Sequence, residues 1–359
     1  SSGDGFKAYY CALYHVKYDT VDAITGGMNY PFGELTAFTD GQPLISNTLR
    51  FLDRFFPVSG ETVVGAINGA MLLSFVLGAL FLFLIMADLG VSWWFAGVAA
   101  VGMAMMSPQV ARFGGHYSLS WLVWIPALLF WIMRFDKTRS FWYSLLIGLT
   151  TFMAAKMHLY FLGFAGFLTG GYWLWRLLPY RKEGGNLAYD LLHFSLQFLI
   201  PVILLQTGIL ILDEVTDRTA YPYGFDIYLG HPAAVFIPSG KPWSFVPKIV
   251  TVFNHISWES LAYAGTPAVA GILVTFYFFI KGRFRFRQAG NGEGRSIMTV
   301  FGVIAVVALI FSFGVPFVFG LEELANKIGP GSQLSALGRF AWLFYYVVNL
   351  LVFTSLFRK

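Results

Sequence analysis

The sequence predicts an all-α integral membrane protein, a polytopic bundle of about nine helices. Hydrophobic residues make up 57% of its 359 positions, and only 12% of residues are charged. The mean hydropathy is +0.65, whereas soluble domains carry about 25% charged residues. The connections between the apolar stretches also alternate in charge, which a bilayer imposes and a soluble core does not. These observations favour a chain that crosses a membrane repeatedly over an ordinary soluble domain.

Nine apolar stretches are predicted to span the membrane. They lie near residues 63–87, 92–107, 118–134, 141–155, 157–177, 189–212, 261–281, 297–319 and 339–357. A helix needs about 20 apolar residues to cross the hydrocarbon core, and fewer where other helices shelter it. The stretches 92–107 and 141–155 are the shortest candidates. Pairs of glycines four apart, at 65 and 69 and at 166 and 170, suit close packing between helices.

The charges of the connections predict how the chain is oriented. The connections after the first, third, fifth, seventh and ninth stretches hold 13 basic and five acidic residues, whereas the opposite side holds 11 basic and 14 acidic residues. Short loops rich in Lys and Arg stay in the cytoplasm. We therefore expect a multi-pass membrane protein with its N-terminal segment facing the periplasm or exterior and its C-terminus in the cytoplasm. The basic run 283–287 is interpreted as a cytoplasmic anchor rather than a nucleic-acid site.

The predicted spans divide the chain into four parts. Residues 1–62 form a first outer loop, 63–212 six spans, 213–260 a second large outer loop, and 261–359 three further spans. The first loop has turn signals at 26–27, 30–33 and 40–43. It also contains an amphipathic stretch from Leu44 to Phe56, with Arg50, Asp53 and Arg54 on its polar side. The outer loops are expected to converge on one vestibule.

Asp4 is the strongest candidate for chemistry because it lies between Gly3 and Gly5. Glycines on both sides let the backbone approach a ligand closely and leave the short carboxylate accessible. Such a carboxylate could accept a proton from a hydroxyl or bind a divalent cation. The alternative is an ordinary turn, in which an aspartate beside a glycine is common.

Two further acids in the same segment, Glu34 and Asp40, each lie beside a turn. Hard cations require several oxygen ligands, so Asp4, Glu34 and Asp40 are predicted to form a Mg²⁺ or Mn²⁺ site. Solvated loop acids are the alternative. The sequence has no His-x-x-x-His or paired-cysteine spacing, so a zinc enzyme is not indicated. It also has no Gly-x-x-x-x-Gly-Lys phosphate loop, which argues against coupling to ATP.

Basic and histidine side chains near the outer ends of the spans could bind a phosphate. Ionisable residues at the membrane edge are candidates for function, and arginine binds phosphate in a bidentate manner. Each could instead extend toward lipid headgroups. The set is Arg112, His116, Lys156, His158, Arg218 and Arg339. His193, within the stretch 189–212, is interpreted as a packing residue or a hydrogen bond between helices.

Four short motifs carry a resemblance to a known family. They are Gly3-Asp4-Gly5-Phe6-Lys7, Asn29-Tyr30-Pro31-Phe32-Gly33-Glu34, Gly115-His116-Tyr117-Ser118-Leu119 and Gly338-Arg339-Phe340. They resemble bacterial membrane proteins allied to the YfhO-like branch. The architecture of most of the chain resembles the GT-C superfamily of polytopic glycosyltransferases, with a long first outer loop and a pair of short helices at 141–155 and 157–177.

The resemblance implies a GT-C-like fold and transfer of a sugar from a polyprenyl-phosphate donor to a hydroxyl on a glycan, lipid or protein. Asp4 matches the family's catalytic acid in the first loop, as a base or a metal ligand. Residues on the outer turns would hold the donor phosphate. The residues carried over beside Asp4, as substrate-binding residues, are Glu34, Arg112, His116, Lys156, His158 and Arg339. Membrane lipids are the expected surroundings, and no nucleic-acid partner is expected.

Two other functions stay open, a non-enzymatic lipid or glycan carrier such as a flippase, and a scaffold subunit of a membrane complex. A carrier should have polar residues along its spans, and these are sparse in this sequence. They are Asn68, Gln197, Gln206 and Asn349.

Overall fold

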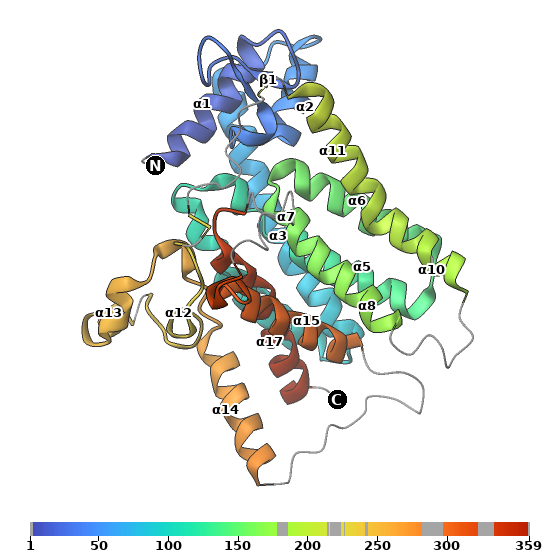
Figure 1. Cartoon of the computed structure of the whole chain (residues 1–359), viewed down its shortest axis with the longest axis vertical. Coiled ribbons are helices and arrows are strands. Elements are labelled where there is room, and N and C mark those ends of the chain that lie inside the picture. The colour runs from blue at the N-terminus through green and yellow to red at the C-terminus, as the bar shows by residue number, and fades with distance from the viewer. Residues whose placement is uncertain are drawn as a thin grey trace. The chain divides into compact units, whose positions relative to one another are not determined.

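The chain is folded almost entirely into helices. A computed structural model describes residues 3–177, 186–213, 215, 224–225, 227–240, 243–281, 297–321 and 334–357. Their only paired strands are β1 (Ile24–Thr25) and β2 (Glu34–Leu35), which are antiparallel with Ile24 opposite Leu35. The predicted all-α class is therefore confirmed. The chain forms two compact units, residues 1–81, 109–170 and 179–218, and residues 82–108, 171–178 and 219–359 (Figure 1).

The first unit contains the N-terminal segment and a group of apolar helices. Its elements are α1 (Asp4–Lys17), α2 (Pro43–Asp53), most of α3 (Gly60–Asp88), α5 (Trp124–Thr138), α6 (Phe141–Met157), α7 (Tyr160–Ala165), α10 (Leu187–Phe194) and α11 (Ile200–Leu212). Short 3₁₀ helices lie at Thr36–Phe38, Val110–Gly114 (η2) and Tyr117–Leu119 (η3). A π-helical turn follows α7 at Gly166–Gly170, and another joins α10 to α11 at Ser195–Leu199.

The second unit is organised around its C-terminal helix. Its elements are α4 (Trp93–Met105), α8 (Gly171–Leu177), α12 (Pro232–Phe236), α13 (Val246–Ile249), η6 (Thr251–His255), η7 (Trp258–Ser260), α14 (Thr266–Ile280), α15 (Ile297–Ser312), η8 (Phe317–Phe319), η10 (Leu337–Phe340) and α17 (Ala341–Phe357). α17 packs against α15 and α14. Trp342, Tyr345 and Tyr346 of α17 are fully buried. The Asn349 amide donates to the carbonyl oxygen of Ala264 at 2.8 Å, which holds the start of α14 against α17.

The predicted number of membrane spans, nine, is too high. Every predicted stretch contains helix, but among the described residues only four helical segments are long and apolar enough to cross a bilayer. They are Gly60–Asp88, Tyr117–Thr138, Leu187–Leu212 and Leu337–Phe357. α4 has 13 residues, a rise of about 20 Å, which is short of a hydrocarbon core about 30 Å thick. Apolar composition alone does not separate a helix buried in protein from one that crosses lipid.

The four long helices indicate a membrane protein because some of them expose apolar surface that water would not tolerate. In an apolar 18-residue stretch of Leu187–Leu212 only 11% of the residues are buried within the protein, compared with 78% in such a stretch of Tyr117–Thr138. Ile203, Leu204 and Leu210 are largely exposed. A contiguous apolar surface of this kind needs a lipid or protein cover. The orientation of the chain in the membrane stays a prediction.

Arg50 holds the N-terminal segment together. Its Nε donates to Asp22 Oδ1 at 2.6 Å, and one terminal nitrogen donates to the backbone carbonyls of His15, at 3.1 Å, and of Asp19. The Arg50 side chain is only 9% exposed. His15 is also buried, with Nδ1 2.8 Å from Asp19 Oδ2 and Nε2 2.6 Å from Asn47 Oδ1. These contacts fix α2 along α1 (Figure 1).

The amphipathic stretch predicted at 44–56 is confirmed as α2 and the turn after it, but only part of its polar side faces water. Of the three residues predicted on the polar side, Arg50 packs against α1 and is buried, whereas Arg54 is largely exposed. Phe51, Phe55 and Phe56 are 55%, 64% and 69% exposed on the outside. An aromatic outer side suits the membrane interface.

Replacing Arg50 by Met should destabilise the protein far more than replacing Arg54 by Met. Both guanidinium groups contact Asp22, but the Arg54 side chain is 54% exposed. We expect a loss of about 2–3 kcal/mol for Arg50→Met, because buried carbonyls and a carboxylate lose a charged donor. The exposed pair should contribute less than about 1 kcal/mol. The free energy of unfolding of each variant, measured in detergent, tests this. Equal losses for Arg50→Met and Arg54→Met would contradict the role given to Arg50.

A candidate acid–base site

Acidic and basic side chains from four segments of the first unit meet in an acid–base cluster, which we define as Asp4, Lys7, Asp40, His116 and His158. His116 Nε2 lies 3.2 Å from Asp4 Oδ2. On the second acid, Lys7 Nζ lies 3.4 Å from Asp40 Oδ2, and His158 Nε2 lies 3.9 Å from Asp40 Oδ1. The cluster therefore contains one carboxylate paired with an imidazole and another that faces an ammonium group and an imidazole.

The start of α1 brings Asp4 to His116. Asp4 is in the first turn of the helix, where a carboxylate is favoured by the N-terminal dipole. The chain before His116 passes close to this turn, since a Cβ added to Gly115 would lie 3.9 Å from the Gly5 nitrogen. The rings of Tyr9 and Tyr117 pack with centroids 5.0 Å apart. This packing holds η3 against α1 and so fixes His116 beside Asp4.

A tight loop before α2 positions Asp40. Its backbone is left-handed, with φ 59°, a conformation that aspartate adopts more readily than most residues. The Ser118 hydroxyl donates to the Asp40 carbonyl oxygen at 3.2 Å, which ties the loop to η3. A Cβ added to Gly41 would lie 3.2 Å from Cys11 Cβ, so the loop also packs closely on α1.

Asp40 is held in its anionic form. Burial raises the pKa of this carboxyl, but the charges of His158, Lys7 and His116 together outweigh burial and hold the pKa below its ordinary value. The Asp40 side chain is 34% exposed, whereas that of Asp4 is 55% exposed. Asp4 is therefore the carboxylate that a solute reaches more readily, and Asp40 organises the cations around it.

Four of the residues predicted from sequence come together here, namely Asp4, Asp40, His116 and His158. Lys7 was not among the predicted site residues. The signal for it is spacing, because Asp4 and Lys7 are three residues apart and share a face once the segment is a helix. Interpreting residues 1–62 as a loop with turns concealed that relation.

Glu34 has local partners in the β-hairpin. Its carboxylate accepts from Asn29 Nδ2 at 2.8 Å and from the Leu35 nitrogen at 3.0 Å. Among the residues that the structure describes, no group of three or more His, Cys, Asp or Glu side chains is arranged to hold a metal ion. A cation bound by Asp4, Glu34 and Asp40 therefore stays a prediction.

The predicted phosphate ligands lie in different surroundings. Arg112, in η2, is only 1% exposed. Lys156 is in the last turn of α6, with Nζ 5.9 Å from the centre of the Phe152 ring, and it lines a pocket. Arg218 lies outside the described residues, as does the basic run 283–287. A role in phosphate binding stays a prediction for Arg112, Lys156 and Arg218.

Arg339, in the second unit, forms a buried ion pair. Its Nε and one terminal nitrogen lie 3.1 and 3.0 Å from Glu259 Oε2, and both side chains are less than 10% exposed. The pair joins η10 to η7. Removing one member of a buried ion pair is costly because the other charge stays buried, so this contact stabilises the second unit. A further role for Arg339 in substrate binding stays a prediction.

His193 joins two helices, as the sequence predicted. Its Nδ1 lies 2.7 Å from Ser144 Oγ of α6, and Gln197 Nε2 donates to the same hydroxyl at 2.9 Å. Ser144, His193 and Gln197 are all fully buried. The prediction that His193 forms a hydrogen bond between helices is therefore confirmed.

Comparison with known proteins identifies the family of the chain. Residues 21–359 match the family model described as domain of unknown function DUF6311, so the chain belongs to that family. The matched region contains Asp40, His116 and His158, whereas the whole of α1, with Asp4 and Lys7, precedes it. No curated protein and no solved structure matches the chain significantly.

Replacing Asp40 by Asn should make the stability of the folded protein depend less on pH in the acidic range. The pKa of Asp40 is lower in the folded chain than its unfolded value, about 3.9. The stabilisation by its ionised form is therefore complete above the unfolded pKa and is lost as pH falls through the folded pKa. Melting temperatures of wild type and Asp40→Asn should converge between about pH 5 and 2. Parallel curves would refute this role.

Proposed function

We propose that this protein is a membrane glycosyltransferase of the GT-C type, which moves a sugar from a polyprenyl-phosphate donor to a hydroxyl acceptor. The observation that carries the proposal is the Asp4–His116 pair at 3.2 Å, in which the carboxylate stays 55% exposed. In the same cluster Lys7 and His158 face Asp40. An accessible carboxylate paired with an imidazole suits proton abstraction, and adjacent cations suit a departing phosphate.

In the proposed reaction Asp4 accepts the proton of the acceptor hydroxyl, with His116 orienting the carboxylate. The hydroxyl oxygen forms a bond to the anomeric carbon of the sugar, and the bond from that carbon to the phosphate oxygen breaks. The electron pair leaves with the lipid phosphate. Lys7 and His158, which surround Asp40, supply positive charge near the group that departs. A Mg²⁺ or Mn²⁺ ion on Asp4 belongs to the same proposal.

A lipid or glycan carrier is the competing function, and the polar residues of the long helices do not favour it. Asn349 donates to the carbonyl oxygens of Ala264 and Tyr345, both at 2.8 Å. Gln197 donates to Ser144 within the first unit. Because these amides bond to neighbouring parts of the chain, they act as packing contacts rather than as the lining of a path for a polar substrate.

Asp4→Asn should abolish glycosyl transfer without unfolding the protein. The amide keeps the shape of the side chain but cannot accept the proton, so the rate should fall by about 100-fold or more. Transfer from a panel of polyprenyl-phosphate hexoses and pentoses, by protein in liposomes with and without EDTA, measures this. Glu61→Gln, at the exposed start of α3, is the matched control. A carrier or scaffold would tolerate Asp4→Asn, and that result would refute the enzyme.

The active vestibule is proposed to face the outside of the cell. In a Cys11→Ser background, cysteine at position 30, where Tyr30 is 86% exposed, should react with an impermeant maleimide in intact cells. Cysteine in place of exposed Lys137 should react only after permeabilisation. The native Cys11 is buried, and burial raises the pKa of its thiol to about 11, so Cys11→Ser removes a thiol that already reacts poorly. The reverse labelling pattern would place the cluster in the cytoplasm.

A further inference from the structure

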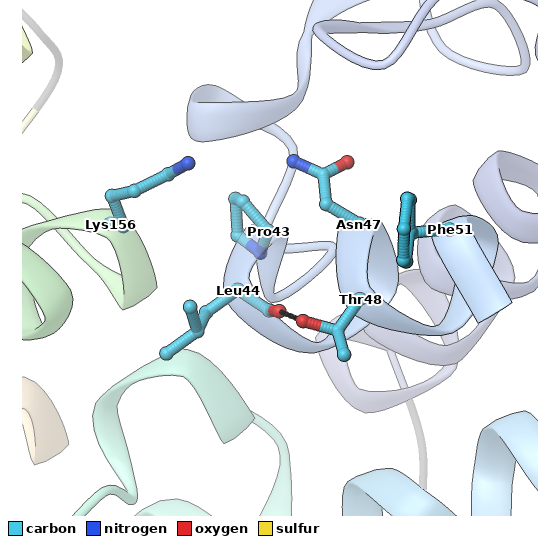
Figure 2. Close-up of a pocket in the computed structure, with 6 residues that line it drawn as sticks. All are labelled: Pro43, Leu44, Asn47, Thr48, Phe51 and Lys156. Carbon is cyan, nitrogen blue, oxygen red and sulfur yellow. Dashed lines mark hydrogen bonds between the residues drawn. The ribbon is translucent and has the colours of Figure 1, made fainter.

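A pocket of about 260 Å³ lies between α2 and the end of α6 (Figure 2). It is lined by Pro43, Leu44, Asn47, Thr48, Phe51 and Lys156. Four of these residues are spaced along one stripe of α2, at positions 44, 47, 48 and 51. Lys156, in the last turn of α6, lines the pocket opposite α2. One side of the pocket is therefore mainly apolar, and the other carries a cation.

Two nitrogen donors point into this space. Figure 2 shows the Lys156 ammonium and the Asn47 amide nitrogen directed toward each other across Pro43. The orientation of Asn47 is fixed, because its Oδ1 lies 2.6 Å from His15 Nε2 behind the pocket. The Thr48 hydroxyl donates to the Leu44 carbonyl oxygen at 2.7 Å and so is not a third donor. An ammonium group and an amide, beside the first turns of a helix, suit an oxyanion such as phosphate.

The apolar part of the pocket continues along the outside of α2. Phe51 lines the pocket, and the rings of Phe51 and Phe55 pack edge to face with centroids 5.3 Å apart. Both rings are more than half exposed. α3, an apolar helix of 29 residues, begins at Gly60, soon after α2 ends at Asp53. This stripe is therefore connected by a short segment to a helix that can enter the bilayer. A lipid hydrocarbon chain from the bilayer would cover the exposed rings of the stripe.

We propose that the pocket between α2 and α6 binds the phosphate headgroup of a membrane lipid. Lys156 and Asn47 hold the phosphate, and the hydrocarbon chain follows the stripe formed by Leu44, Phe51 and Phe55. A small soluble anion would use the two donors but would leave the exposed aromatic stripe uncovered. The combination of a cationic end and an apolar end therefore favours a lipid.

The pocket shares its two walls with the acid–base cluster. Asp40 precedes Pro43, the first residue of α2, by three positions, and His158 follows Lys156 by two. A lipid phosphate held in the pocket is thus bound by the same two segments that carry Asp40 and His158. This step rests on the proposed function, because the pocket is the donor site only if the bound lipid is a polyprenyl phosphate.

Binding of lipids to the full chain in detergent, measured by native mass spectrometry, tests the pocket. The probes are undecaprenyl phosphate, phosphatidic acid and undecaprenol, which lacks the phosphate. Lys156→Gln should weaken binding of the phosphate lipids by about 10-fold, since a charge-assisted contact is lost, and Lys156→Arg should restore it. Lys137→Gln, an exposed lysine at the end of α5, is the control. Unchanged binding by Lys156→Gln would overturn the proposal.

A second measurement covers the hydrocarbon chain and does not depend on Lys156. A photoreactive phosphatidic acid added to the wild-type protein should label peptides that contain residues 44–55. Phe51→Ser should reduce this labelling, and Phe141→Ser, whose ring is exposed to a similar degree on α6, should not. Labelling confined to other parts of the chain would overturn the proposal.

The two proposals fail in different ways. A preference for undecaprenyl phosphate over phosphatidic acid supports the pocket as a donor site, and equal binding supports a general site for phosphate lipids. If Lys156→Gln lowers lipid binding but no sugar transfer is found, the pocket stands and the glycosyltransferase does not. If transfer occurs and Lys156→Gln changes neither lipid affinity nor the KM for the donor, only the pocket is refuted.

Discussion

The Arg50 guanidinium is the contact on which the N-terminal segment depends. It draws the end of α1 and the chain that follows onto α2, through Asp22 and the carbonyls of His15 and Asp19. Asp4 lies at the other end of α1, and Asp40 lies just before α2. The two carboxylates of the cluster are therefore placed by the packing of these two helices. A buried charge that satisfies several acceptors fixes such packing more specifically than apolar contact does.

The same packing gives α2 the reverse of the arrangement found in a surface helix of a soluble protein. Its charged residues meet α1, and its aromatic residues face outward. In water this arrangement would expose several phenyl rings, whereas at a bilayer surface the rings enter the headgroup region. The arrangement also explains why a pocket on α2 is both cationic and apolar. Lys156 approaches from α6 on one side, and the aromatic stripe continues away from it.

Within the cluster, the two acids have different surroundings and so suit different tasks. Asp40 is more buried and faces Lys7 and His158, which keep it ionised and order the loop that precedes α2. Asp4 is more exposed and has His116 beside it. Pairs of ionisable groups in contrasting environments are typical of sites that move protons. The second unit, with its buried Arg339–Glu259 pair, shows the contrasting case of charges used for packing.

The sequence by itself determined the class of the protein, the helical stretches and most of the charged residues of the cluster. Apolar composition and helical spacing are local properties, so they can be recognised in the sequence without knowledge of the fold. The structure decided that, among the apolar stretches of the described chain, four form helical segments long enough to cross a membrane. It also decided that Arg50 is buried, that Lys7 joins Asp40, and that Lys156 faces Asn47. Each of these depends on which distant segments pack together, and burial and pairing of charges follow from that packing rather than from neighbours in the chain.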